Sequence, residues 1–209
     1  MLQSRSIFAA LLALSFFFNG AQAWFWRSRI VIGYAIVSEE QAARINQDHK
    51  LGLQEFSYTP QLGPGFYLVN KIENLMSRAG SRYCAVQARK WKVRRIAKVN
   101  IPETYDKMTP RGVRTQRLWA RDEKVIEEYI QTRALITPPE KALRFAWIMG
   151  LEGELQMAIP AKLLSDEKSL YLYAECFETE RELAEFSKEV IRWDTWKITG
   201  DRGQKGWLN

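Results

Sequence analysis

The chain has 209 residues, a formal net charge of +7 and 46% hydrophobic residues. That hydrophobic share excludes an intrinsically disordered protein, and the length is enough for one domain with its own core. The single histidine, His49, lies in a polar stretch, and the two cysteines are far apart in the sequence. This composition argues against a Ser-His-Asp hydrolase, a thiol protease and a zinc site, so we expect no metal centre.

The first 23 residues have the order of a secretory signal peptide. Arg5 precedes an apolar run over 7–18, and the segment closes with Ala21-Gln22-Ala23. An apolar stretch of about 12 residues is shorter than the ~20 that a membrane-spanning helix needs. We expect cleavage after Ala23 and a secreted, extracellular protein without a membrane span. It should have one domain over 24–198 and a flexible tail over 199–209.

Both cysteines, Cys84 and Cys176, lie in the part of the chain that follows the signal peptide. In an oxidising compartment an even pair of cysteines predicts one disulfide. The alternative is two buried free thiols.

The predicted elements begin with a strand over 30–37, which is apolar on both faces. Ser38 and Gln41 have the spacing of a capping box, which predicts a helix over 39–46. A turn over 61–65 precedes a short strand over 66–69, and further strands are expected over 83–88 and 93–101.

The second half of the chain begins with a helix over 121–135, in which apolar residues recur at helical spacing. Strands are predicted over 155–159 and 170–177. Thr179 and Glu182 form a second capping box and open a helix whose inward residues are Leu183, Phe186 and Val190. Strands and helices mix without regular alternation, which predicts an α+β fold and not a doubly wound sheet.

Two stretches of the chain are strongly basic. The range 89–98 holds six basic residues and no acid, and Arg111, Arg114, Arg117 and Arg121 form a second series. Such stretches attract nucleic acid, acidic membranes or anionic ligands, and the alternative is a solvated basic surface. Export makes nucleic acid, bound through Arg89 to Lys98, the weaker partner hypothesis, unless the target lies inside another cell.

Three segments, taken together, resemble the mono-ADP-ribosyltransferases. The range 32–38 (IGYAIVS) is similar to their first strand, 62–70 (LGPGFYLVN) to their G-x-G-F-Y strand, and 152–160 (EGELQMAIP) to their glutamate strand, in the same order. With secretion added, the chain also resembles secreted effectors of plant-infecting fungi that are thought to carry this fold. The resemblance implies two small packed antiparallel sheets with flanking helices.

The resemblance also implies a site that cleaves nicotinamide from NAD, where a carboxylate stabilises an oxocarbenium-like ribose. The implied NAD-binding residues are Gly33, Tyr34, Ala35, Gly65, Phe66 and Tyr67, and the implied catalytic residues are Glu152, Glu154 and Gln156. Two registers stay open: one puts Gln156 at the catalytic glutamate, and the other keeps an intact Glu152-x-Glu154 pair. Strand alternation would place all three side chains on one face.

Two functions follow from these residues. In the first, the chain is a secreted virulence effector or toxin-like protein with a degenerate NAD site. It would be a monomer that binds a host protein, outside cells or after translocation into them. In the second, it is an active mono-ADP-ribosyltransferase with NAD as substrate. Ala35, where the family carries Arg or His, and Gln156 favour the first function, whereas Glu152-x-Glu154 keeps the second open.

Overall fold

The computed structural model describes residues 28–76 and 79–204. The predicted signal peptide, its cleavage point after Ala23 and the last five residues of the predicted tail lie outside this part. Within the described ranges, no helix combines the length and the apolar character that crossing a membrane requires.

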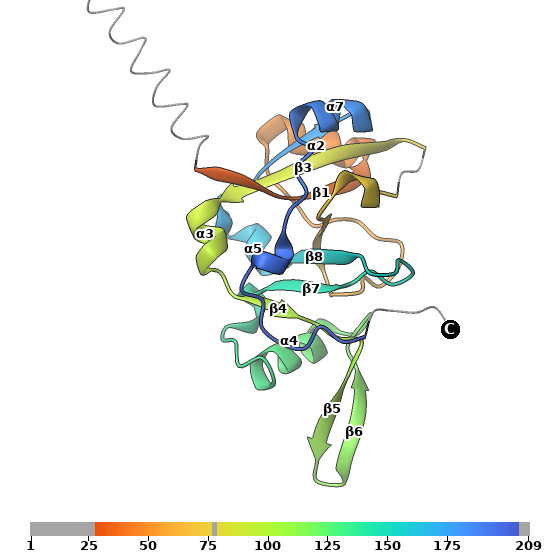
Figure 1. Ribbon diagram of the computed structural model, residues 1–209, viewed down its shortest axis with the longest axis vertical. Coiled ribbons are helices and arrows are strands. Elements are labelled where there is room, and N and C mark those ends of the chain that lie inside the picture. The colour runs from red at the N-terminus through yellow and green to blue at the C-terminus, as the bar shows by residue number, and fades with distance from the viewer. Residues whose placement is uncertain (1–27, 77–78, 205–209) are drawn as a thin grey trace, which may run out of the picture.

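Seven strands form one mixed sheet in the order β4-β7-β8-β2-β1-β3-β9, in which only β4 and β7 run parallel. These strands are β1 (Arg29–Ser38), β2 (Gly65–Val69), β3 (Ser81–Arg89), β4 (Lys98–Asn100), β7 (Leu143–Trp147), β8 (Leu155–Pro160) and β9 (Tyr173–Phe177). A separate hairpin of β5 (Thr104–Thr109) and β6 (Gly112–Arg117) projects from one end of the body (Figure 1).

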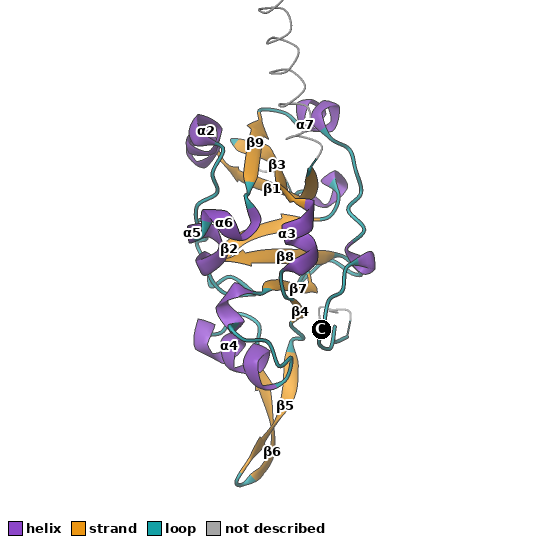
Figure 2. Ribbon diagram, turned by 90° about the vertical axis from the view of Figure 1, so that its left-hand side faces the viewer, coloured by secondary structure: helices purple, strands orange, loops and turns teal. Residues whose placement is uncertain are grey.

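Helices flank the sheet, but they do not alternate regularly with the strands along the chain. They are α2 (Glu39–Asp48), α3 (Lys90–Arg95), α4 (Glu123–Thr132), α5 (Ala161–Ser165), α6 (Glu167–Leu170) and α7 (Glu180–Phe186), with short 3-10 turns η1 (Ile72–Asn74), η2 (Pro139–Lys141) and η3 (Trp193–Thr195). Figure 2 shows α2 and α7 on opposite sides of the β1-β3-β9 end, and α4 near the base of the hairpin. The α+β prediction is confirmed.

The prediction of two separate sheets is wrong, because all seven main strands share one sheet. Its two halves, β9-β3-β1 and β2-β8-β7-β4, join where Tyr34 of β1 pairs with Val69 of β2. A Cβ atom on Gly33 would lie 2.7 Å from Cβ of Leu68, closer than carbon atoms can approach. Glycine at this position therefore lets β1 come near enough to β2 to connect the halves.

The capping residues lie where the sequence predicts them. Thr179 and Glu182 form a complete reciprocal capping box. Oγ of Ser38 accepts a hydrogen bond from the Gln41 backbone at 3.2 Å, but the Gln41 side chain donates to the Leu53 carbonyl at 3.0 Å, so the first predicted box is only half formed. The inward positions predicted after Leu183 are wrong. Helix α7 ends at Phe186, which is 36% exposed, and Val190 lies beyond the helix and is 51% exposed.

The predicted strand over 93–101 is also wrong in its first half, where the chain forms α3 before β4 begins at Lys98. Strand alternation would turn Val93 and Arg95 to the same face. In the helix, Val93 is buried while Arg95 is exposed to solvent. The helix thus buries the apolar side chain without burying a charge.

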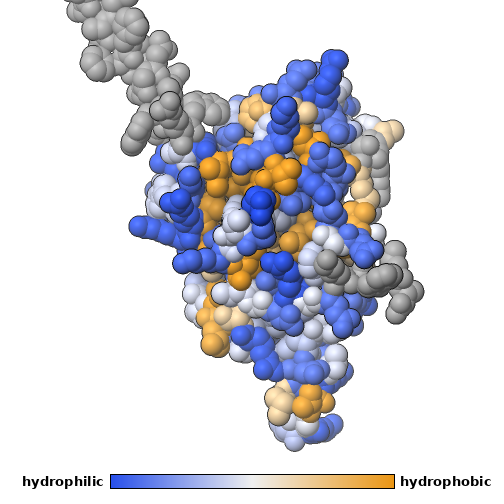
Figure 3. Space-filling view, in the orientation of Figure 1, coloured by the Kyte–Doolittle hydropathy of each residue, from blue (hydrophilic) through white to orange (hydrophobic). Residues whose placement is uncertain are grey.

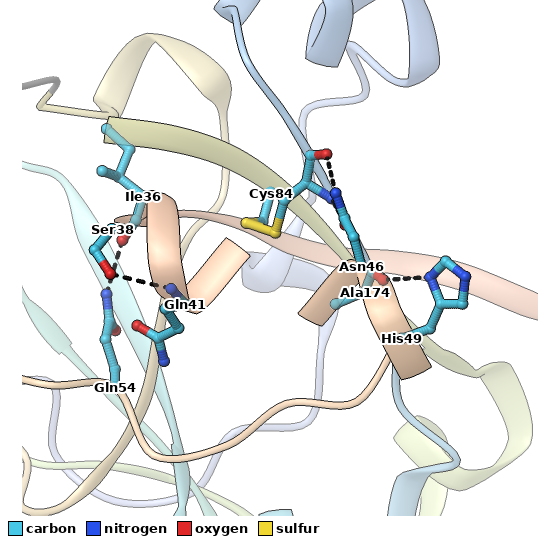
Figure 4. Close-up of a disulfide and its surroundings, with 9 residues drawn as sticks. Ile36, Ser38, Gln41, Asn46, His49, Gln54, Cys84 and Ala174 are labelled. Atoms are coloured by element: carbon cyan, nitrogen blue, oxygen red, sulfur yellow. Dashed lines mark hydrogen bonds between the residues drawn. A yellow bond between two sulfur atoms is a disulfide. The ribbon is translucent and has the colours of Figure 1, made fainter. Parts of the chain in front are cut away.

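Cys84 and Cys176 form the predicted disulfide. The two residues are directly opposed on β3 and β9, so the bond links neighbouring strands at one edge of the sheet. The side chain of Asn46 in α2 donates to the carbonyl of Cys176 and accepts from its N–H, both at 2.8 Å (Figure 4). The disulfide therefore links β3 to β9, and Asn46 ties α2 to β9 at the same place.

The first residues of the predicted tail contact β4 and β7. The Asn100 N–H donates to the Thr199 carbonyl at 2.8 Å, and the indole N–H of Trp147 donates to the Gly203 carbonyl at 3.3 Å. The chain therefore lies against the sheet through 203, beyond the predicted domain boundary at 198.

We expect Gly65→Ala to lower the free energy of unfolding by about 2 kcal/mol through overpacking. A Cβ atom on Gly65 would lie 2.5 Å from the backbone carbonyl oxygen of Ile159, so β2 and β8 would have to separate. Gly52→Ala is the control, because no atom lies within 4 Å of its added Cβ. Urea unfolding of both variants checks this, and equal midpoints would contradict it.

Candidate functional site

A cleft of about 800 Å³ opens beside β1, β2 and β8, which lie next to one another in the sheet. Its volume lies within the usual range of ligand pockets, roughly 300–1,000 Å³. Tyr34 pairs with Val69, and Val69 pairs with Gln156, so the three residues form one row across the three strands. At strand spacings of about 4.8 Å, the row is ~10 Å long. The structure thus brings together the three segments that resemble the transferases.

The residues with implied roles in NAD binding divide into two groups. Tyr34, Ala35 and Tyr67 line the cleft, whereas Gly33, Gly65 and Phe66 do not. The two glycines allow the close approach of neighbouring strands, and Phe66 is fully buried in the core. Strand packing alone accounts for the second group.

The two first-strand residues offer a ligand no free polar side-chain atom. The hydroxyl of Tyr34 donates to the Glu189 carbonyl at 2.9 Å and contacts Oγ of Ser187 at 2.8 Å. Burial raises the pKa of the Tyr34 phenol, so the group stays neutral. Ala35 is 2% exposed and lies opposite Cys84. Both side chains belong to the core.

Tyr67 forms a fixed wall of the cleft. Its hydroxyl donates to the Gly63 carbonyl at 2.8 Å and accepts from the Leu62 N–H at 2.7 Å. Its ring meets the ring of Phe56 edge to face, with centroids 5.1 Å apart. Burial raises the pKa of the Tyr67 phenol, so this group too stays protonated.

The three residues with implied catalytic roles do not share one strand face, so that prediction is wrong. Glu152 is exposed in the turn between β7 and β8, where Gly150 and Gly153 have positive φ. The turn continues to Glu154, and β8 begins only at Leu155, so strand alternation does not reach Glu152. Of the three, only Gln156 lines the cleft.

Glu154 is held by two residues that follow β2. Nζ of Lys71 lies 2.7 Å from one carboxylate oxygen, and Nδ2 of Asn74 donates to the other at 2.6 Å. Partial burial acts to raise the pKa of the Glu154 carboxyl. The hydrogen bonds from Lys71 and Asn74 outweigh it and hold this pKa below its ordinary value. Glu154 is therefore ionised, and its charge is already compensated.

Gln156 belongs to a network of amide side chains. Its Nε2 donates to Oε1 of Gln61 at 2.6 Å, and Gln61 in turn donates to the Trp147 carbonyl at 2.8 Å. A carboxylate at 156 would face the carbonyl oxygen of Gln61, so the network favours the neutral amide. In the sequence, nothing marks Gln61, Lys71 or Asn74 as site residues except their nearness to the second family-like segment.

The described residues that line the cleft include no lysine, arginine or histidine. The acid among them, Glu55, is exposed and lies 3.1 Å from Arg44. The rest are aromatic, aliphatic, small or amide side chains. The pyrophosphate of NAD calls for cationic partners, which these described walls do not supply. No three His, Cys, Asp or Glu residues of the described ranges gather as metal ligands.

Comparison with known proteins gives a family for this chain. Residues 60–201, about two thirds of the sequence, match the model of a family of unknown function, DUF5910. The chain belongs to the DUF5910 family. No curated protein and no solved structure matches it. The region matched to DUF5910 includes β2, β8 and the residues that hold Glu154, and it begins after β1.

We expect the stability of the protein to fall more steeply in acid when Glu154 is present than when it is absent. Its pKa is lowered in the folded state, so the ionised carboxylate stabilises the fold above the unfolded pKa of about 4.3. That contribution is lost as the pH falls through the lower folded value. Glu154→Gln should therefore lose less stability than wild type between pH 5 and pH 3, measured by urea unfolding.

The matched control is Glu152→Gln, which removes the same charge from an exposed turn. It should follow the wild-type pH dependence. Identical pH profiles for wild type and Glu154→Gln would show that the Lys71 and Asn74 contacts do not persist in solution.

Proposed function

We propose that this chain is a secreted, effector- or toxin-like protein on an ADP-ribosyltransferase-like scaffold. It binds a host protein through its cleft and does not turn over NAD. The observation that carries the proposal is the adjacency of β8, β2 and β1 around one cleft, with their residues in a single row. Core packing alone does not require the three family-like segments to meet at a cavity.

The charges at the site support the proposed lack of turnover. Cleavage of nicotinamide builds positive charge on the ribose, which a nearby carboxylate must stabilise. Glu154 is already paired with Lys71, and Gln156 is neutral. Loss of such electrostatic stabilisation is worth about 3 kcal/mol, or ~100-fold in rate. The buried Ala35 adds no anchor for the cofactor.

The lining of the cleft favours a polypeptide over a dinucleotide. The lining combines aromatic and aliphatic side chains with the amides of Gln41, Gln54 and Asn74. Two of the lining residues, Tyr58 and Met76, are 65% and 62% exposed. Exposed apolar side chains beside polar amides are typical of surfaces that bind another protein. An uncharged segment of the host target is therefore the proposed occupant.

The second candidate is an active mono-ADP-ribosyltransferase, and the ionised Glu154 favours it, since its side chain is 28% exposed. Nicotinamide release from NAD by the secreted protein separates the two functions. We expect no release above the uncatalysed background. Release by wild type that Glu154→Gln reduces ~100-fold, while Glu152→Gln leaves it intact, would establish the enzyme instead.

A further inference from the structure

Helix α3 presents a cluster of cations that the cleft does not use. Lys90, Lys92, Arg94 and Arg95 lie on this six-residue helix, and within the described ranges none of them forms an ion pair with a carboxylate. Val93 packs inward, so the charged side chains stay at the surface. Figure 3 shows hydrophilic residues projecting where α3 lies in Figure 1.

Two further arginines extend this cluster. Arg29 of β1 and Arg89 of β3 are directly opposed, and like charges in that arrangement destabilise a sheet. Burial and the charge of Arg89 both lower the pKa of Arg29. The Lys90 N–H donates to the Ser28 carbonyl at 2.9 Å, which ties α3 to the start of β1. Nη1 of Arg29 donates to the Tyr171 carbonyl at 2.7 Å, which holds this charge beside Tyr171.

Aromatic rings alternate with these cations. Trp91 is 43% exposed, with Nζ of Lys92 at 4.7 Å and the guanidinium of Arg95 at 5.4 Å from its ring centroid. Tyr171, at the end of α6, has the guanidinium of Arg89 at 4.7 Å and Nζ of Lys92 at 5.3 Å. Cation–π contacts of this kind hold the charges in place before a ligand arrives.

We propose that α3 and the adjoining ends of β1 and β3 bind single-stranded nucleic acid. Lysine and arginine contact the phosphates, and Trp91 stacks on a base, which is the combination that single-strand binding sites use. An anionic membrane is the poorer occupant, because Trp91 is the large apolar side chain that α3 exposes, and insertion needs a wider apolar face. Lys98 takes no part, since it is 5% exposed. This site is separate from the cleft and does not depend on the function proposed for it.

The test is fluorescence anisotropy of labelled oligothymidylate and oligouridylate, about 12 nucleotides long, titrated with the secreted protein at several salt concentrations. If each of the four cations of α3 contacts one phosphate, the slope of log K against log salt should be near −3 for single strands. Lys92→Gln with Arg95→Gln should reduce the magnitude of that slope by about 1.4. Trp91→Ala should weaken binding about tenfold with the slope unchanged.

The matched control is Arg111→Gln with Arg114→Gln, which removes the same charge from the exposed hairpin. It should bind within about twofold of wild type. An equal loss in this control would show non-specific attraction to a basic protein and overturn the proposal. The proposal would also be overturned if the protein bound phosphatidylserine vesicles but neither oligonucleotide, and if the α3 variants weakened that vesicle binding.

Discussion

Replacing Cys84 and Cys176 together by alanine should lower the free energy of unfolding by about 4 kcal/mol. The bond closes a loop with a sequence separation of 92 residues, and the chain-entropy model gives roughly 4–5 kcal/mol for a loop of that length. The loss should be large because the bond holds β9, the edge strand, to β3. Urea unfolding at neutral pH measures it.

The control uses a reductant. Dithiothreitol should lower the unfolding midpoint of wild type to that of the double variant and leave the variant unchanged. A loss below about 1 kcal/mol would contradict the expectation and would indicate a denatured state that is already compact.

Glu123→Gln should lower the free energy of unfolding by about 3 kcal/mol. Arg144 of β7 is fully buried and donates two hydrogen bonds to Glu123 of α4, at 2.7 and 2.9 Å. Removing the acid leaves an uncompensated charge in the core, which typically costs 3–5 kcal/mol. Arg144 also donates to the Leu62 carbonyl at 2.9 Å, next to Gln61 of the amide network. The variant should therefore also weaken the support of Gln156, which lines the cleft and bonds to Gln61.

The matched control is Glu103→Gln, whose partner Arg117 lies at 3.3 Å. Both side chains of that pair are nearly half exposed, so its loss should change stability by less than about 1 kcal/mol. If both variants unfold at the same urea concentration, the buried ion pair does not stabilise the fold as its burial implies.

The sequence predicts well the elements whose residues carry their own local signal. The apolar run of β1, the Gly-Pro-Gly turn before β2 and the capping box of α7 each depend on neighbours within a few positions. The disulfide was predicted from the oxidising compartment that the predicted signal peptide implies, together with the presence of only two cysteines.

The elements that the sequence did not predict depend on distant partners. Strand β7 carries Arg144 at its second position. The ion pair with Glu123 compensates that charge inside the buried strand. The hairpin β5–β6 is mostly exposed and so lacks an alternation of buried apolar residues. At the site, Lys71 and Asn74 lie about 80 residues from Glu154. Only the folded chain shows that they neutralise it.

Calorimetric titration of the purified protein with NAD tests most directly the proposal that the cleft does not bind this dinucleotide. We expect no heat of binding up to millimolar NAD, because the described walls of the cleft carry no cation for the pyrophosphate and the hydroxyl of Tyr34 is engaged within the core. Single-site binding in the micromolar range that a folded Tyr67→Ala variant loses would contradict this proposal. It would favour the active mono-ADP-ribosyltransferase instead.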